Sequence, residues 1–200
     1  MASSVPVPRT PPEDGGGVTR WYERELGWAV TEGPPPQLVT GVRFDVLELP
    51  APAGVALLGR IGSGAGPVAL VGRGALQRMQ LLVAAGCADE LPGLLEWLQW
   101  GGIALDLTAI GAGGRIIAPV PPGRPDPCSR GAAVWLRPPE PRHEVEPALP
   151  SVSPLCGRGA GSRGNGAPDL VRLVDAAATE CHRARLFRAK AAGNQTLAFS

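Results

Sequence analysis

The chain has 200 residues and a formal net charge of +1, so no long-range electrostatic field draws the whole molecule onto nucleic acid or a membrane. Hydrophobic residues make up 44% of the sequence, which is enough for the core of one domain. The 28 glycines and 23 prolines cluster unevenly, and we therefore expect a folded centre between loose segments.

Hydrophobic periodicity predicts a series of helices and strands. The expected helices are 18–26, 53–61, 88–100 and 168–192. The expected strands are 28–31, 38–49, 66–72, 78–86, 103–110, 115–118 and 131–139. Because helices and strands do not strictly alternate, the pattern indicates an α+β domain with a largely antiparallel sheet.

The segments between and around these elements set the expected organisation. Residues 1–17 are rich in proline and glycine and are expected to be disordered. We also expect a folded domain at 18–158, a flexible linker at 159–167 and a tail at 193–200. The GAGG sequence at 111–114 lies between two strands, so it predicts a β-hairpin and not a phosphate-binding loop.

Two helices carry predictions about packing. We expect Trp97 and Trp100, at the end of the leucine-rich helix, to lie in the core. The C-terminal helix at 168–192 is amphipathic, and its apolar stripe predicts a docking face for its own domain or for another chain. The stripe consists of Leu170, Leu173, Val174, Ala177, Ala178, Cys181 and Leu186.

The cysteines and histidines do not have the spacing of a zinc site. The four cysteines are Cys87, Cys128, Cys156 and Cys181, and the histidines are His143 and His182. We expect four free thiols in a reducing cytosol. No signal peptide and no apolar stretch of membrane-spanning length is present in the sequence, so a cytoplasmic location without membrane contact is expected.

The stretch VRFDVLELPAPAG at 42–54 predicts a buried strand that ends in a proline turn. It carries two carboxylates in apolar surroundings, Asp45 and Glu48. Since they are three residues apart, they point to opposite faces of a regular strand and do not easily share one metal ion.

The order of several segments resembles the N-terminal domain of bifunctional DNA primase/polymerases, the prim-pol domain of the archaeo-eukaryotic primase superfamily. These segments, within residues 18–158, are WYERELGWAV, VTGVRFDVLELPAPAG, GPVALVG, LPGLLEWLQW, IALDLTAIGAGGRIIAPVPPG and GAAVWLRPP. The resemblance implies a bacterial, replication-related protein with an RRM-like, palm-like sheet. It also implies an Asp-x-Asp strand, a Ser-x-His strand and a third Asp, which together hold two metal ions and a nucleoside triphosphate.

The family's functional positions are incomplete in this chain. Aligned on Gly54, the first acid corresponds to Glu48 and the second to Pro50, which cannot bind a metal through its side chain. The strand QRMQLLVA has no histidine, while Asp106 matches the third acid. The resemblance therefore implies that Glu48 and Asp106 are the surviving catalytic and metal positions, with Mg²⁺ or Mn²⁺ as cofactor only if this residual site binds metal.

Each candidate residue also has a structural interpretation. Asp45 would then be an edge-strand carboxylate paired to Arg43 or to a neighbouring strand, and Glu48 a partner of an arginine. Asp106 would then cap backbone N–H groups before the glycine turn. Arg73, Arg78 and Arg115 are candidates for binding nucleotide or nucleic acid along the sheet, or are ordinary surface arginines.

We expect a degenerate primase/polymerase-like protein without polymerase activity, with a regulatory or accessory role and with binding of nucleotide or single-stranded nucleic acid. One alternative is an active, metal-dependent primase/polymerase in which a strand bulge brings Asp45, Glu48 and Asp106 together. The other is a protein-interaction module that recruits a protein partner through residues 168–192. The sequence leaves all three open.

Overall fold

The computed structural model describes residues 15–31, 33–123, 133–140, 145–146, 149–152 and 169–197. The predictions made for residues 1–14 and 159–167, and for Cys128, His143 and Cys156, lie outside the described residues.

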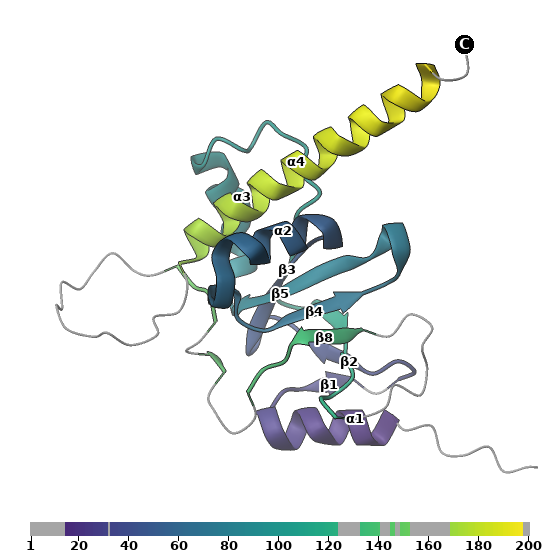
Figure 1. The fold of residues 1–200 in the computed structure, drawn as a ribbon. Helices are drawn as coiled ribbons and strands as arrows, with labels where there is room; N and C mark the ends of the chain where they lie inside the picture. The colour runs from purple at the N-terminus through teal and green to yellow at the C-terminus, as the bar shows by residue number, and fades with distance from the viewer. Residues whose placement is uncertain are drawn as a thin grey trace, which may run out of the picture.

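The described residues form helices on both sides of antiparallel sheets (Figure 1). The helices are α1 Gly15–Trp21, α2 Ala51–Ile61, α3 Cys87–Trp97 and α4 Leu170–Leu197, with the π-helical turn η1 Tyr22–Leu26 and the 3-10 turns η2 Gly62–Ala65 and η3 Gly74–Leu76. The strands are β1 Val30–Thr31, β2 Gln37–Val39, β3 Phe44–Pro50, β4 Val68–Val71, β5 Arg78–Ala84, β6 Thr108–Ile110, β7 Arg115–Ile117 and β8 Val134–Arg137. Every ladder between these strands is antiparallel, so the predicted α+β class is confirmed.

The larger sheet has the strand order β6-β3-β5-β4-β8, and the smaller sheet has the order β1-β2-β7. Residues 44–110 pass through β3, α2, β4, β5, α3 and β6 in turn. Each of the helices α2 and α3 therefore connects two strands that have another strand between them. This split β-α-β-β-α-β arrangement is that of RRM-like folds, in agreement with the sequence prediction.

One face of the larger sheet is covered by α2, α3 and α4 (Figure 1). Leu47 and Leu81 of the sheet share one buried cluster with Leu57 of α2, Leu91 of α3 and Leu173 of α4. Burial of side chains of this size is the main stabilising contribution to such a layer, at about 2 kcal/mol each.

The opposite face carries a second, more aromatic cluster. Phe44 and Leu82 of the sheet pack there with Tyr22, Trp28 and residues of the smaller sheet. The Tyr22 hydroxyl donates a hydrogen bond of 2.6 Å to the carbonyl of Pro119 and accepts one of 2.9 Å from the indole N–H of Trp135. Burial raises the pKa of Tyr22, so this phenol stays protonated and keeps donating.

Helix α2 follows strand β3 without a loop. Pro50 ends the strand, and Pro52 suits the first turn of the helix because N–H groups there have no intrahelical partner. Gly54 faces Met79 of β5 so closely that a Cβ would overlap with the methionine side chain. The glycine thus lets the helix begin directly against the sheet.

The apolar stripe of the C-terminal helix packs against its own domain, which is one of the two alternatives expected from the sequence. Leu170, Leu173, Val174, Ala177, Ala178 and Cys181 are buried. Leu186 was expected in the same stripe but is 56% exposed. Helix α4 also continues to Leu197, through residues that the sequence assigns to a tail. None of the helices in the described part is both long and apolar enough to cross a membrane.

The single strand predicted at 38–49 is wrong, because this segment forms β2 in one sheet and β3 in the other. The break lies at Gly41, which has a φ of 85°. A Cβ there would overlap with the backbone of Ala112, so the chain turns where a glycine faces the 111–114 segment. Apolar and β-branched residues continue on both sides of Gly41, so the sequence pattern does not reveal this change of sheet.

The predicted hairpin at 111–114 is also wrong. The turn closes with a hydrogen bond from Gly114 N–H to the Gly111 carbonyl, but β6 and β7 on its two sides belong to different sheets. Thr40 fixes this crossing by donating through its hydroxyl to Gly111 at 2.6 Å. The prediction of Trp97 in the core is wrong as well, since its side chain is 70% exposed at the end of α3.

Candidate functional site

The register of the larger sheet brings together the polar residues of its three central strands. Glu48 of β3 lies opposite Gln80 of β5 on one side and opposite Thr108 of β6 on the other. Arg78 lies two residues before Gln80, and the period of a strand therefore puts both side chains on the face that Glu48 also occupies. Asp106 precedes β6 by two residues.

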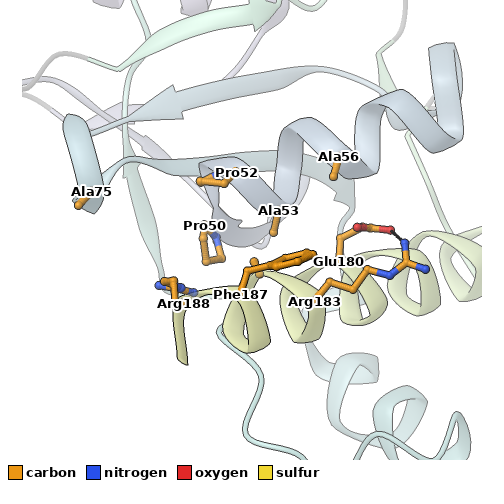
Figure 2. Close-up of a pocket in the computed structure, with 10 residues that line it drawn as sticks. Pro50, Pro52, Ala53, Ala56, Ala75, Glu180, Arg183, Phe187 and Arg188 are labelled. Carbon is orange, nitrogen blue, oxygen red and sulfur yellow. Dashed lines mark hydrogen bonds and ion pairs between the residues drawn. The ribbon is translucent and has the colours of Figure 1, made fainter. Parts of the chain in front are cut away.

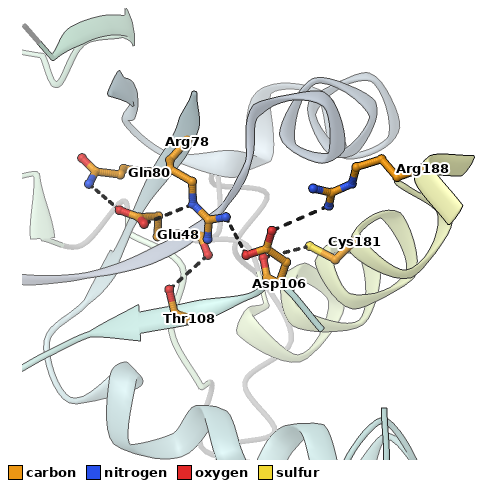
Figure 3. A network of polar contacts seen from close by, with 7 residues as sticks. All are labelled: Glu48, Arg78, Gln80, Asp106, Thr108, Cys181 and Arg188. Carbon is orange, nitrogen blue, oxygen red and sulfur yellow. Dashed lines mark hydrogen bonds and ion pairs between the residues drawn. The ribbon is translucent and has the colours of Figure 1, made fainter. Parts of the chain in front are cut away.

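These residues form one network of polar contacts, shown in Figure 3 and called here the Arg78 network: Glu48, Arg78, Gln80, Asp106 and Arg188. Arg78 donates from Nε to Oε1 of Glu48 at 3.2 Å and from Nη1 to Oδ1 of Asp106 at 2.6 Å. Gln80 donates to Oε2 of Glu48 at 2.8 Å, and Nη2 of Arg188 lies 3.6 Å from Oδ2 of Asp106. All four carboxylate oxygens thus face a nitrogen donor of the protein.

The guanidinium of Arg78 is held firmly in its charged form. Partial burial by itself would lower the pKa of Arg78. The hydrogen bond and charge of Asp106, together with those of Glu48, outweigh this effect and raise the pKa. Arg78 is therefore a fixed cation between the two carboxylates.

Asp106 is tied to helix α4 as well as to the sheet. Its backbone carbonyl accepts a weak hydrogen bond from the Cys181 thiol at 3.8 Å. Burial, followed by the charge of Asp106, raises the pKa of Cys181 to about 12, so this thiol stays protonated and is a poor nucleophile. The carboxylate pairs with arginines and caps no turn that the structure records, so the predicted capping role is replaced by ion pairing.

Asp45 lies on the other face of β3, as its spacing from Glu48 predicts. It is 1% exposed and accepts a hydrogen bond of 2.9 Å from the backbone N–H of Ala88 at the start of α3. The expectation of an edge-strand carboxylate paired to Arg43 is wrong, because β3 is an internal strand and Arg43 pairs with Glu146 at 3.4 Å. Asp45 stabilises the first turn of α3 and does not join the Arg78 network.

The three candidate arginines lie on different elements. Arg78 is at the start of β5 in the larger sheet, whereas Arg73 is exposed just before η3. Arg115 is exposed on β7 of the smaller sheet. Of the three, Arg78 is the one that contacts Glu48 and Asp106.

Two members of the Arg78 network are not among the sequence candidates. Gln80 could have been found from the strand period, because it shares a face with Arg78 and lies two residues from it. Arg188 has no such signal. It reaches Asp106 from the far half of α4, and only the docking of that helix creates the contact.

Glu48 and Asp106 do not fit the requirements of a two-metal centre. Such a centre needs several oxygen ligands free to bind two cations about 3.5–4 Å apart. Here the carboxylate oxygens already face Arg78, Gln80 and Arg188. Within the part of the chain that the structure describes, no group of three or more His, Cys, Asp or Glu side chains could hold a metal ion.

A comparison of the chain with protein-family models, with curated proteins and with solved structures finds no match to any of them. The resemblance to primase/polymerase domains accordingly rests on the sequence segments within residues 18–158 alone.

Proposed function

We propose that this chain is a degenerate primase/polymerase-like protein that lacks polymerase activity and serves an accessory or regulatory role. One observation carries the proposal: Arg78 bridges Glu48 and Asp106, the two residues that the resemblance assigns to metal binding. An arginine in this place satisfies the carboxylates without a metal ion.

The chemistry of phosphoryl transfer explains why this substitution matters. Metal ions polarise the phosphoryl oxygens and stabilise both the attacking and the leaving oxygen. A guanidinium supplies charge and hydrogen bonds in a fixed plane but leaves no open coordination position. Arg78 therefore neutralises the two carboxylates but provides no means of activating a 3′-hydroxyl as a nucleophile.

Binding of nucleotide or single-stranded nucleic acid is part of the proposal. Arg188 supports it, since its side chain is 59% exposed and its 3.6 Å contact with Asp106 is long for a hydrogen bond. A phosphate can engage such a guanidinium through two parallel hydrogen bonds.

The decisive experiment combines primer synthesis and extension assays with direct Mn²⁺ binding, monitored by electron paramagnetic resonance. The wild-type chain should yield no product with Mg²⁺ or Mn²⁺ and should bind no Mn²⁺ up to about 1 mM, which corresponds to only about 4 kcal/mol of affinity. Arg78→Ala should bind Mn²⁺ because it frees the two carboxylates, and Arg78→Ala combined with Asp106→Asn should not.

Product formed by the wild type and lost in Asp106→Asn would establish the active-enzyme alternative and overturn the proposal. Labelled dNTP and labelled single-stranded DNA should be titrated in parallel. The expected result is binding that does not require a metal ion and that weakens in Arg188→Gln. No binding of either ligand would remove the nucleotide part of the proposal.

A further inference from the structure

The two halves of helix α4 have different surroundings. The helix is 28 residues long, which corresponds to about 42 Å. Its first half is buried up to Cys181, whereas Leu186 is 56% exposed and Phe187 is 72% exposed. Figure 1 shows the helix continuing past the other elements. Short helical segments without tertiary packing are marginal in water, so a partner that covers this projecting half would stabilise it.

A groove of about 730 Å³ lies where the projecting half leaves the domain (Figure 2). One wall is formed by Pro50, Pro52, Ala53, Ala56 and Ala75, and the other by α4, with Ala184 and Phe187. Proline and alanine side chains lose almost no rotamer freedom when they are covered. The wall formed by these proline and alanine residues is thus largely preformed, and the groove offers a mainly apolar surface.

The charge around the groove is positive. Glu180 is one carboxylate shared by two guanidiniums, with Arg60 at 3.2 Å and Arg183 at 2.9 Å. Residues 181–200 contain Arg183, Arg185, Arg188 and Lys190 but neither Asp nor Glu. A segment that lies along this half of α4 would therefore be favoured by carboxylates on its polar face.

The apolar walls favour a protein segment over a nucleic acid. Strands of nucleic acid bind through rows of phosphate contacts and stacked aromatic side chains. In this groove, Phe187 is the aromatic residue among the lining side chains. Proline, alanine and phenylalanine surfaces instead match the apolar side chains of an amphipathic helix.

We propose that the groove between α2 and α4 receives an acidic amphipathic helix of a partner protein. Its apolar side chains lie against Phe187 and Ala56, and its carboxylates face Arg183 and the basic residues that follow. This inference goes beyond the proposed function, because it does not depend on whether the Arg78 network is catalytically silent.

The test is fluorescence anisotropy of the full chain with a labelled, designed helical peptide of about 18 residues, with leucine on one face and glutamate on the other. Wild-type protein should bind it with a dissociation constant below about 100 µM. Phe187→Ala and Ala56→Glu should each weaken binding by about tenfold or more. Val55→Glu is the matched control: it adds the same charge on the same helix at an exposed position outside the groove, and binding should change by less than about threefold.

Three further probes determine which occupant the groove accepts: the same peptide with lysine in place of glutamate, a scrambled peptide of the same composition, and single-stranded DNA of similar charge. Neither altered peptide should bind, and any binding of DNA should be unchanged in Phe187→Ala. Failure of the acidic amphipathic peptide to bind overturns the inference. So does equal binding of the scrambled peptide, or DNA binding that Phe187→Ala abolishes. Circular dichroism of each variant checks that it is folded. The polymerase and Mn²⁺ measurements test the proposed function independently of this groove.

Discussion

Strand β3 carries one carboxylate near each end, and the surroundings of the two differ. The end at Asp45 is closed: one oxygen accepts the Ala88 N–H and the other is buried without a hydrogen-bond partner. The end at Glu48 is open: its oxygens face Arg78 and Gln80, and the side chain of Glu48 is 21% exposed. The comparison indicates that the closed end maintains the fold, while the open end holds paired charges that remain partly exposed.

The largest expected effect on stability is just before the closed end of β3, where Gly41 contacts Ala112. Gly41→Ala adds a Cβ against backbone at a φ of 85°, so the free energy of unfolding should fall by about 3 kcal/mol or more. Urea denaturation measures it. Gly59→Ala, in an exposed part of α2 with open space around it, is the control and should be neutral or stabilising by up to about 1 kcal/mol. A loss below about 1 kcal/mol for Gly41→Ala would mean that the 111–114 turn yields easily.

Removal of the closed-end carboxylate is expected to have the next largest effect. Asp45→Ala leaves the Ala88 N–H without its acceptor, and the free energy of unfolding should fall by about 2 kcal/mol. Asp89→Ala, an exposed acid in the first turn of the same helix, should cost about 0.5 kcal/mol. Equal losses in the two variants would show that Asp45 acts only through its charge near the helix terminus.

At the open end, Arg78→Gln should lower the free energy of unfolding by about 1 kcal/mol, because Glu48 and Asp106 lose their shared cation. The network is partly exposed, so about 1 M NaCl should reduce the difference from wild type. Arg43→Gln breaks the more exposed pair with Glu146 and should change stability by less than about 0.5 kcal/mol. A difference for Arg78→Gln that salt does not reduce would point to packing instead of charge.

The smallest expected effect concerns pH and Cys181. Its pKa is raised to about 12 in the folded chain by burial, against about 8.5 when unfolded. The unfolded state therefore loses this proton first, and the stabilisation present below about pH 8.5 is lost as the pH rises toward 12. Between pH 7 and about pH 9, wild type should lose about 0.8 kcal/mol more than Cys181→Ala. Denaturation curves of both proteins at the two pH values cancel the contribution of Tyr22. Parallel losses would show that the pKa of this thiol is the same in the folded and the unfolded chain.

Local sequence patterns predict much of this molecule. The helices at 53–61, 88–100 and 168–192 are found close to their observed positions because apolar periodicity and helix-terminal residues are local signals. Among the candidate site residues, Glu48, Arg78 and Asp106 do come together. The resemblance singles out Glu48 and Asp106, and Arg78 is one of the three arginines expected along the sheet.

The remaining features depend on contacts between distant segments. The division of 38–49 between two sheets follows from Gly41 meeting Ala112, about 70 residues away along the chain, and no periodicity signals that meeting. Arg188 joins Asp106 only after α4 has docked. Trp97 is exposed even though a large aromatic side chain suggests burial. Helix α4 packs beside α3 without covering that residue.

The docking of α4 also has a consequence for how the protein is made. Leu170, Leu173 and Val174 belong to the same buried cluster as Leu47 and Leu81, which are synthesised far earlier. At a translation rate of about 5–20 residues per second, the sheet waits several seconds for the helix that completes its cover. During that interval the apolar face of the β-α-β-β-α-β unit is not covered by α4, so this cluster is completed only after α4 has been synthesised.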